Sequence, residues 1–277
     1  MIANLPQREE YLRKKRKRKL IKWGIGVFVF VVLVALSSYV SHRSELRISQ
    51  VELSGGILVT GDEVSAKSLE YMKGSYFWLY PKNNSLWYPK KGLEEYLSES
   101  FKRIDTIKIH LKNAKTMVVE ITERKPFALW CDTLPSGDTV EGQCYFIDQN
   151  STIFAEAPQF SGDAYFKYFG NISSSTPIGA EYMASTTEFS EISDFVTAIK
   201  ELSIKPVYLI AKENGEFSLV ISGGGQIYFD DREPLSQALK NLESLLTAPE
   251  LASSTSKNLP IDYIDLRYGN KLFYKLK

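Results

Sequence analysis

The chain has 277 residues, of which 44% are hydrophobic and 24% are charged. This is the balance of folded protein and excludes an intrinsically disordered chain. The formal net charge is only +1, but the charges are segregated. Residues 1–22 carry nine lysines and arginines against two glutamates, a net charge of +7, whereas the remainder carries 25 bases against 31 acids, a net charge of −6.

Residues 23–40 form an apolar run without a charged side chain. A run of about 20 apolar residues can cross the hydrocarbon core of a bilayer as a helix. Trp23 and Tyr39 lie at its ends, where aromatic rings prefer the headgroup level, and seven consecutive bases at 13–19 mark the cytoplasmic side. The sequence predicts a single-pass protein of the cell membrane, with 1–22 as a cytoplasmic tail, 23–40 as a transmembrane helix and the rest extracytoplasmic.

The N-terminal region has two alternative interpretations. Ala35-Leu36-Ser37 resembles a signal-peptide cleavage site, but the apolar run is longer than the usual stretch of about 7 to 15 residues. The basic run could bind nucleic acid, yet its position beside the apolar run is explained by topology and by attraction to anionic lipid. We expect a membrane anchor and no nucleic-acid partner.

Residues 45–124 predict a small sheet with two helices on one face. A short strand at 51–53 is followed by a helix from about Thr60 to Met72, which Gly74 is placed to end. Pro89 can open a second helix. Alternating residues at 107–111 and 117–121 then predict an antiparallel hairpin. The expected order is strand, helix, helix, strand, strand.

Residues 125–277 predict a second, β-rich domain with flanking helices, so the fold class is α+β. Asn214-Gly215 and Gly223-Gly224-Gly225 are typical of hairpin turns between strands. Helices are expected at 188–202 and 234–246. Strands are expected at 143–155, 206–212, 216–222, 226–230 and 262–275.

The sequence offers little catalytic chemistry. Its two histidines, His42 and His110, have no suitably placed serine or cysteine, and HExxH and CxxC motifs are absent. The glycine run at 223–225 lacks the following helix and lysine of a phosphate loop. We expect no catalytic, cofactor-binding or metal-binding residues, no small-molecule substrate and no enzymatic activity.

Two residue pairs in the second domain are expected to be structural. Cys131 and Cys144 would form a cross-strand disulfide if Trp130 and Tyr145 lie on paired strands; the alternative is two reduced thiols. Asp265 and Arg267 alternate along one predicted strand and therefore share a face, which favours an ion pair over a catalytic pair.

Three motifs in register resemble the FtsQ/DivIB family of bacterial cell-division proteins, whose first extracytoplasmic domain is a POTRA domain of the order predicted at 45–124. Residues 123–130 read ERKPFALW, similar to the family's crossing into its β domain. Residues 145–154, YFIDQNSTIF, are similar to a hairpin of that domain, with Asn150-Ser151 where the family usually has glycine. Residues 264–268, IDLRY, match its C-terminal strand.

The resemblance implies a non-enzymatic scaffold of the division septum that links early and late cell-division proteins. Its partners would be bitopic coiled-coil proteins of the FtsB/DivIC and FtsL types, bound by addition of a strand to a C-terminal strand at 266–276. Tyr268 occupies the family's aromatic position near the partner surface, and Leu272 and Tyr274 share its strand parity. The expected partner-binding residues are Leu266, Tyr268, Leu272 and Tyr274.

Two other functions are alternatives to the scaffold. A membrane-anchored cell-wall enzyme would need a pair of acids in a groove, and no such pair stands out in the sequence. A POTRA-containing assembly or secretion component would usually repeat its POTRA unit, and the sequence has no internal repeat.

Overall fold

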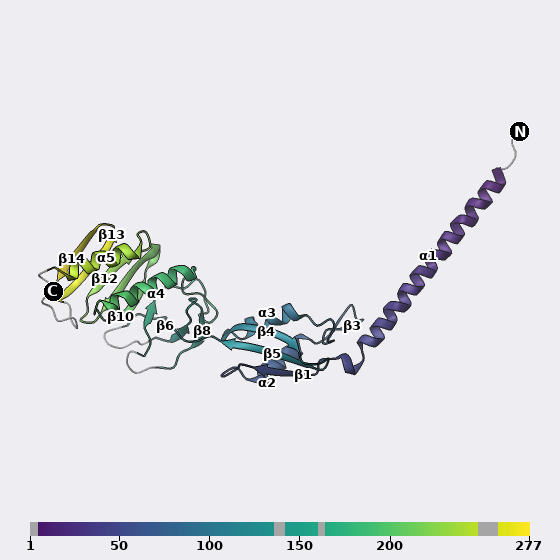
Figure 1. The fold of residues 1–277 in the computed structure, drawn as a ribbon, viewed down its shortest axis with the longest axis horizontal. Coiled ribbons are helices and arrows are strands. Elements are labelled where there is room, and N and C mark those ends of the chain that lie inside the picture. The colour runs from purple at the N-terminus through teal and green to yellow at the C-terminus, as the bar shows by residue number, and fades with distance from the viewer. Residues whose placement is uncertain (1–4, 136–141, 160–163, 249–259) are drawn as a thin grey trace. The chain divides into compact units, whose positions relative to one another are not determined.

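A computed structural model describes residues 5–135, 142–159, 164–248 and 260–277 (Figure 1). The chain divides into two compact units, residues 1–123 and 124–277. The division falls one residue before the boundary expected from the sequence.

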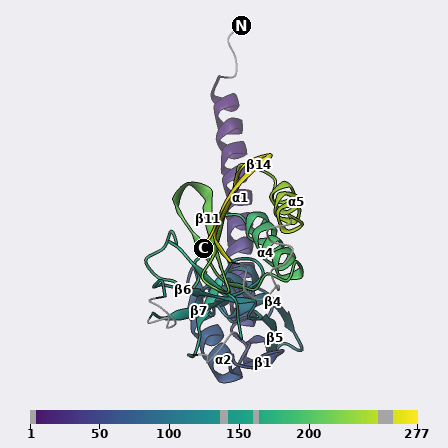
Figure 2. The same ribbon diagram turned by 90° about the vertical axis from the view of Figure 1, so that its left-hand side faces the viewer.

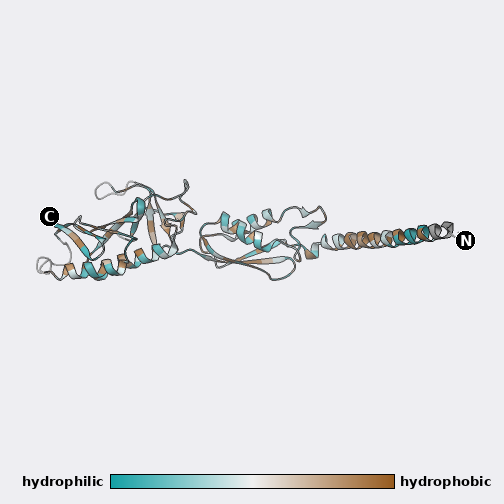
Figure 3. Ribbon diagram, turned by 90° about the horizontal axis from the view of Figure 1, so that it is seen from above, coloured by the Kyte–Doolittle hydropathy of each residue, from teal (hydrophilic) through white to brown (hydrophobic). Residues whose placement is uncertain are grey.

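The N-terminal helix α1 spans Leu5–Ser41 and is longer than the predicted segment. It begins inside the basic tail because lysine, arginine and leucine favour helices and Pro6 lies in the first turn, where proline is tolerated. Residues 11–41 are long and apolar enough to cross a membrane, by length and composition. Figure 3 shows the apolar residues gathered in the part of α1 nearer its C-terminal end.

The first domain contains a three-stranded sheet of order β1-β5-β4, in which β1 is parallel to β5 and β4 is antiparallel to it. A 3₁₀ turn at Ser44–Leu46 precedes this domain, and a two-stranded hairpin lies between its two helices. The elements are β1 (Gln50–Ser54), α2 (Gly61–Tyr71), β2 (Ser75–Tyr76), β3 (Tyr80–Pro81), α3 (Lys90–Ser100), β4 (Ile104–Leu111) and β5 (Thr116–Glu123).

Local sequence signals account for both helices of this domain. Thr60 caps α2 through a capping box with Glu63, Gly74 follows with a positive φ of 89°, and α3 begins directly after Pro89. Both helices pack on one face of the sheet through apolar side chains. The buried cluster contains Val64, Leu93, Leu97, Ile109, Met117, Val119 and Ile121. The expected helices and the β4-β5 hairpin are therefore confirmed.

The second domain is built on a nine-stranded sheet of order β14-β13-β12-β11-β10-β9-β6-β7-β8. Its strands are β6 (Ala128–Cys131), β7 (Cys144–Ile147), β8 (Ile153–Glu156), β9 (Lys167–Phe169), β10 (Pro206–Ala211), β11 (Glu216–Ile221), β12 (Gln226–Asp230), β13 (Ile261–Tyr268) and β14 (Lys271–Leu276). The helices are α4 (Thr186–Glu201) and α5 (Leu235–Leu246), with a 3₁₀ turn at Glu213–Gly215.

Each helix of the second domain connects a pair of parallel strands. Helix α4 joins β9 to β10, and α5 lies between β12 and β13. Such crossovers are almost always right-handed, and here α4 and α5 lie on the same face of the sheet (Figure 2). They cover the main core, which includes Tyr168, Phe189, Ile199, Leu219, Leu242 and Ile264.

The sheet differs from the prediction at four places. The segment 143–155, expected as a strand, is two antiparallel strands, as the resemblance of 145–154 to a hairpin implied; the left-handed residue of their turn is Ser151, with φ 70°. The strand predicted at 262–275 is also two strands, because Gly269 turns the chain with φ 61°. Strands β6 and β9 were not predicted as separate elements. The hairpin turns at 214–215 and 223–225 are confirmed.

Glu123, the last residue of β5, fastens the loop after β1 to the sheet. Its Oε1 atom accepts hydrogen bonds from the backbone N–H groups of Ile57, Leu58 and Val59 at 2.7, 2.8 and 2.9 Å. Burial by itself would raise the pKa of Glu123, but these donors and the charge of Arg103 lower it below the ordinary value of 4.5.

We expect Glu123→Gln to destabilise the first domain by about 1.5 kcal/mol. This is the lower end of the range for hydrogen bonds to a charged group, and we choose it because Glu123 is only half-buried. Since the folded-state pKa is depressed, the stabilisation is present above pH 4.5 and is lost as the pH falls through the folded value. Urea unfolding of the detergent-solubilised chain at several pH values measures both effects. Glu120→Gln, on the exposed face of β5, is the matched control and should leave the pH dependence unchanged.

Candidate protein interface

Strand β14 is the last strand of the nine-stranded sheet and pairs with β13 alone among the described strands. The sheet has a second end at β8. An edge strand offers backbone N–H and C=O groups to a further strand. Among the seven C-terminal residues only Leu272 is not exposed, so most side chains of β14 face solvent. The C-terminal hairpin, β13 with β14, is therefore the candidate interface.

The turn of this hairpin is held by α5. Asn241 of α5 donates a hydrogen bond from Nδ2 to the carbonyl oxygen of Gly269 at 2.6 Å. The register of β13 and β14 shifts between the pair Asp265–Phe273 and the pair Tyr268–Lys271. The bulge and the turn together determine which side chains the edge presents.

The four predicted partner-binding residues do not form one row. Tyr268 is 55% exposed, and Tyr274 is also exposed. Leu272 is half-buried and packs against the main core. Leu266 is only 2% exposed, so its side chain belongs to the core beneath the helices and is not available to a partner. The assignment of Leu266 as a contact residue is wrong in this respect.

The expected shared parity of Tyr268, Leu272 and Tyr274 is also wrong, because the chain reverses at Gly269 and Tyr268 pairs with Lys271. With the turn at Gly269, the ring of Tyr268 instead meets the ring of Phe273, edge to face, with centroids 5.1 Å apart. Phe273 is exposed and was missed by the sequence analysis. We call Tyr268 and Phe273 the aromatic pair of the interface.

Asp265 and Arg267 form the ion pair expected from the sequence. Arg267 donates from Nε and Nη2 to the Asp265 carboxylate at 2.8 and 2.6 Å and lies 3.0 Å from Glu216 of β11. Its guanidinium also stands over the ring of Tyr228, 5.5 Å from the centroid. Burial raises the pKa of Asp265, but hydrogen bonds from Arg267 outweigh it and lower the pKa. The cluster links β13 to β11 and β12.

We expect Arg267→Ala to destabilise the second domain by about 2 kcal/mol, because it leaves the buried Asp265 without its cation. The matched control is Lys275→Ala, which breaks the pair with Asp262 at 2.9 Å on the exposed side of the same hairpin. Exposed pairs contribute little, so this variant should unfold like the wild type. Equal stability of the two variants in thermal unfolding would contradict the role given to Arg267.

Cys131 and Cys144 form a disulfide in the structure. They are register partners on β6 and β7, with Cα atoms 4.1 Å apart, and Trp130 and Tyr145 are the neighbouring pair. Cys131 is buried in a small cluster with Leu129 and Phe169 that is separate from the main core. The disulfide therefore closes the loop between the two strands; its residues 136–141 lie outside the described part of the chain.

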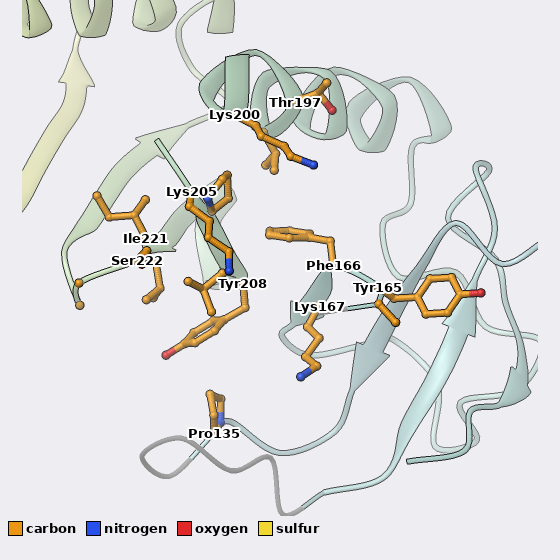
Figure 4. A pocket seen from close by; sticks show the side chains of 17 residues that line it. Pro135, Tyr165, Phe166, Lys167, Thr197, Lys200, Lys205, Tyr208, Ile221 and Ser222 are labelled. Atoms are coloured by element: carbon orange, nitrogen blue, oxygen red, sulfur yellow. The ribbon is translucent and has the colours of Figure 1, made fainter. Parts of the chain in front are cut away.

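A cleft of about 740 Å³ lies in the second domain, and Figure 4 shows its lining side chains. Lys167, Lys200 and Lys205 line it together with Phe166 and Tyr208, and no described lining residue carries a carboxylate. Its charge favours anions. Its lining also includes Pro135, which adjoins a segment outside the described residues, so the cleft is a weaker candidate site than the hairpin.

Within the described residues, no group of three or more histidine, cysteine, aspartate or glutamate side chains could hold a metal ion. His42 binds the carbonyl oxygen of Ser38 through Nδ1, and His110 faces Glu120 on the exposed side of β4 and β5. Neither a scan against protein-family models nor a search of curated proteins finds a match to this chain.

Proposed function

We propose that the protein is a non-enzymatic scaffold of the bacterial division septum, of the FtsQ/DivIB type, which links early and late division proteins. The observation that carries the proposal is the C-terminal hairpin, an edge strand at the end of a large sheet with an exposed aromatic pair beside it. The sequence resemblance supplies the biological setting.

The binding mode proposed here is strand addition to β14. A partner strand would continue the sheet through backbone hydrogen bonds, which give affinity without depending on sequence. Specificity would come from side chains near the edge, above all the aromatic pair, because aromatic residues dominate protein interfaces. The partners would be bitopic coiled-coil proteins of the FtsB/DivIC and FtsL types.

Helix α1 would serve as a membrane anchor, so that a modest affinity of β14 for its partner would be sufficient for binding. Confining both partners to one membrane raises their effective concentration. The basic residues at 13–19 would orient the helix with its N-terminus in the cytoplasm. The two domains would then act on the extracytoplasmic side.

The first test is localisation in dividing cells. A fluorescent protein fused to the N-terminus should collect at midcell before constriction, whereas the same fusion carrying only residues 1–44 should spread around the membrane. A uniform membrane signal from the full chain would refute a septal function. A midcell signal from the short fusion would show that α1, rather than the exported domains, directs localisation.

The second test addresses the hairpin. We expect Tyr268→Ala combined with Phe273→Ala to lower partner recovery in a pull-down at least tenfold, as hot-spot aromatic residues do. Ile178→Ala, which removes an exposed apolar side chain of the same domain outside the hairpin, is the matched control. Ending the chain at Asn270 removes β14 and spares Leu266 in the core, so it should abolish recovery. Unchanged recovery with the truncated chain would contradict strand addition at this edge, and unchanged recovery with the double variant would contradict the role given to the aromatic pair.

A further inference from the structure

The β2-β3 hairpin of the first domain exposes two large aromatic side chains at its tip. Phe77 is 84% exposed and Trp78 is 93% exposed. Both adopt positive φ angles, 48° and 59°, which are uncommon for bulky residues. Neither ring contributes to the domain core. The strained backbone therefore holds both rings out in solvent, at a cost that folding alone does not explain.

The same hairpin is bonded to the C-terminal end of α1. The hydroxyl of Tyr80 lies 2.7 Å from Ser37 Oγ, and Ser38 Oγ donates to the carbonyl oxygen of Leu79 at 2.7 Å. Asn84, which is fully buried, donates from Nδ2 to the carbonyl oxygen of Ser41 at 2.8 Å. These bonds fix the hairpin at one level along the helix.

That level corresponds to the edge of a bilayer if α1 spans one. Ser37 lies four residues before the helix end, which is about 6 Å along the axis at 1.5 Å per residue. Tyr39, the expected headgroup-level residue at this end, lies between Ser38 and Ser41. A hairpin bonded at Ser37 and Ser38 therefore brings its tip close to the membrane–water interface.

The residues around the tip have the character of an interfacial surface. Trp87 is exposed, and its ring approaches that of Tyr80, with centroids 6.2 Å apart. Lys82 stands over Tyr76 and Arg43 over Tyr39, at 5.8 and 5.4 Å from the ring centroids. Aromatic rings prefer the headgroup level, and basic side chains beside them attract anionic headgroups.

We propose that Phe77 and Trp78 insert into the outer lipid interface and form a second membrane contact of the protein. The strained turn presents the two rings to the lipid, and the bonds to α1 set their depth. This contact would hold the first domain against the bilayer rather than leave it on a free tether. The inference goes beyond the proposed function and rests only on α1 crossing the membrane, so it can fail while the septal proposal stands.

The test uses the full chain in phosphatidylcholine nanodiscs, whose two faces are both open to solvent. The native cysteines form a disulfide, so a cysteine introduced by Phe77→Cys can be labelled alone with an environment-sensitive dye. We expect blue-shifted emission, quenching by lipid-attached quenchers and several-fold weaker quenching by iodide than at a control site. The control is Ile57→Cys. Ile57 is 87% exposed and follows the C-terminal end of β1, where its backbone N–H donates to Glu123.

A second measurement avoids the dye. Brominated phosphatidylcholine should quench the wild-type tryptophan fluorescence more than that of Trp78→Asn, since asparagine tolerates the positive φ and leaves the turn intact. Equal quenching of both proteins, together with iodide access at 77 equal to that at 57, would overturn the proposal. Shielding of position 77 that appears only after a partner protein is added would also overturn it and would assign the tip to a protein contact.

Discussion

The second domain depends on one three-residue strand, β9. It is parallel to β6 on one side and to β10 on the other, and without it the nine-stranded sheet would be two separate pieces. Tyr168 and Phe169 are almost fully buried on opposite faces, one in the main core and the other beside the disulfide. The carbonyl oxygens of Phe169 and Gly170 accept bonds from Tyr182 and Trp130 at 2.9 and 3.0 Å.

Gly170 shows how closely the strands approach one another there. A Cβ atom at this position would lie 2.7 Å from the carbonyl oxygen of Ala211, and the φ of 139° suits glycine. The short strand is thus stabilised by its pairing with β6 and β10. Through β9 the strands that end at the edge β14 belong to the same sheet as the strands β6, β7 and β8.

Much of this fold follows from local signals. Thr60 with Glu63 marks the start of α2, and Asn214-Gly215 marks a hairpin, because capping and positive φ angles demand particular residue types. Strand β9 carries no such signal: three residues show no periodicity, and only pairing on both sides makes them a strand. The same holds for β2 and β3, which have only two residues each.

The sequence predicts only part of the candidate interface, and the reason resembles that for β9. Alternation along IDLRY correctly places Asp265 and Arg267 together, because they lie on one strand. Side chains beyond Gly269 depend on the turn and on the bulge before it, and neither is visible as a pattern of apolar residues. The side chain beside Tyr268 is therefore Phe273, whereas the sequence predicted that Leu272 would share its face.

Asn84 joins the first domain to the end of α1. Its buried amide is satisfied by Ser41, at the end of α1, so the first domain reaches its full complement of hydrogen bonds only with that helix in place. The last turn of α1 therefore belongs to the hydrogen-bonded structure of the first domain and is not a separate linker. A chain that begins after Ser41 would lose both bonds to Asn84 and uncover a side chain that the intact chain buries.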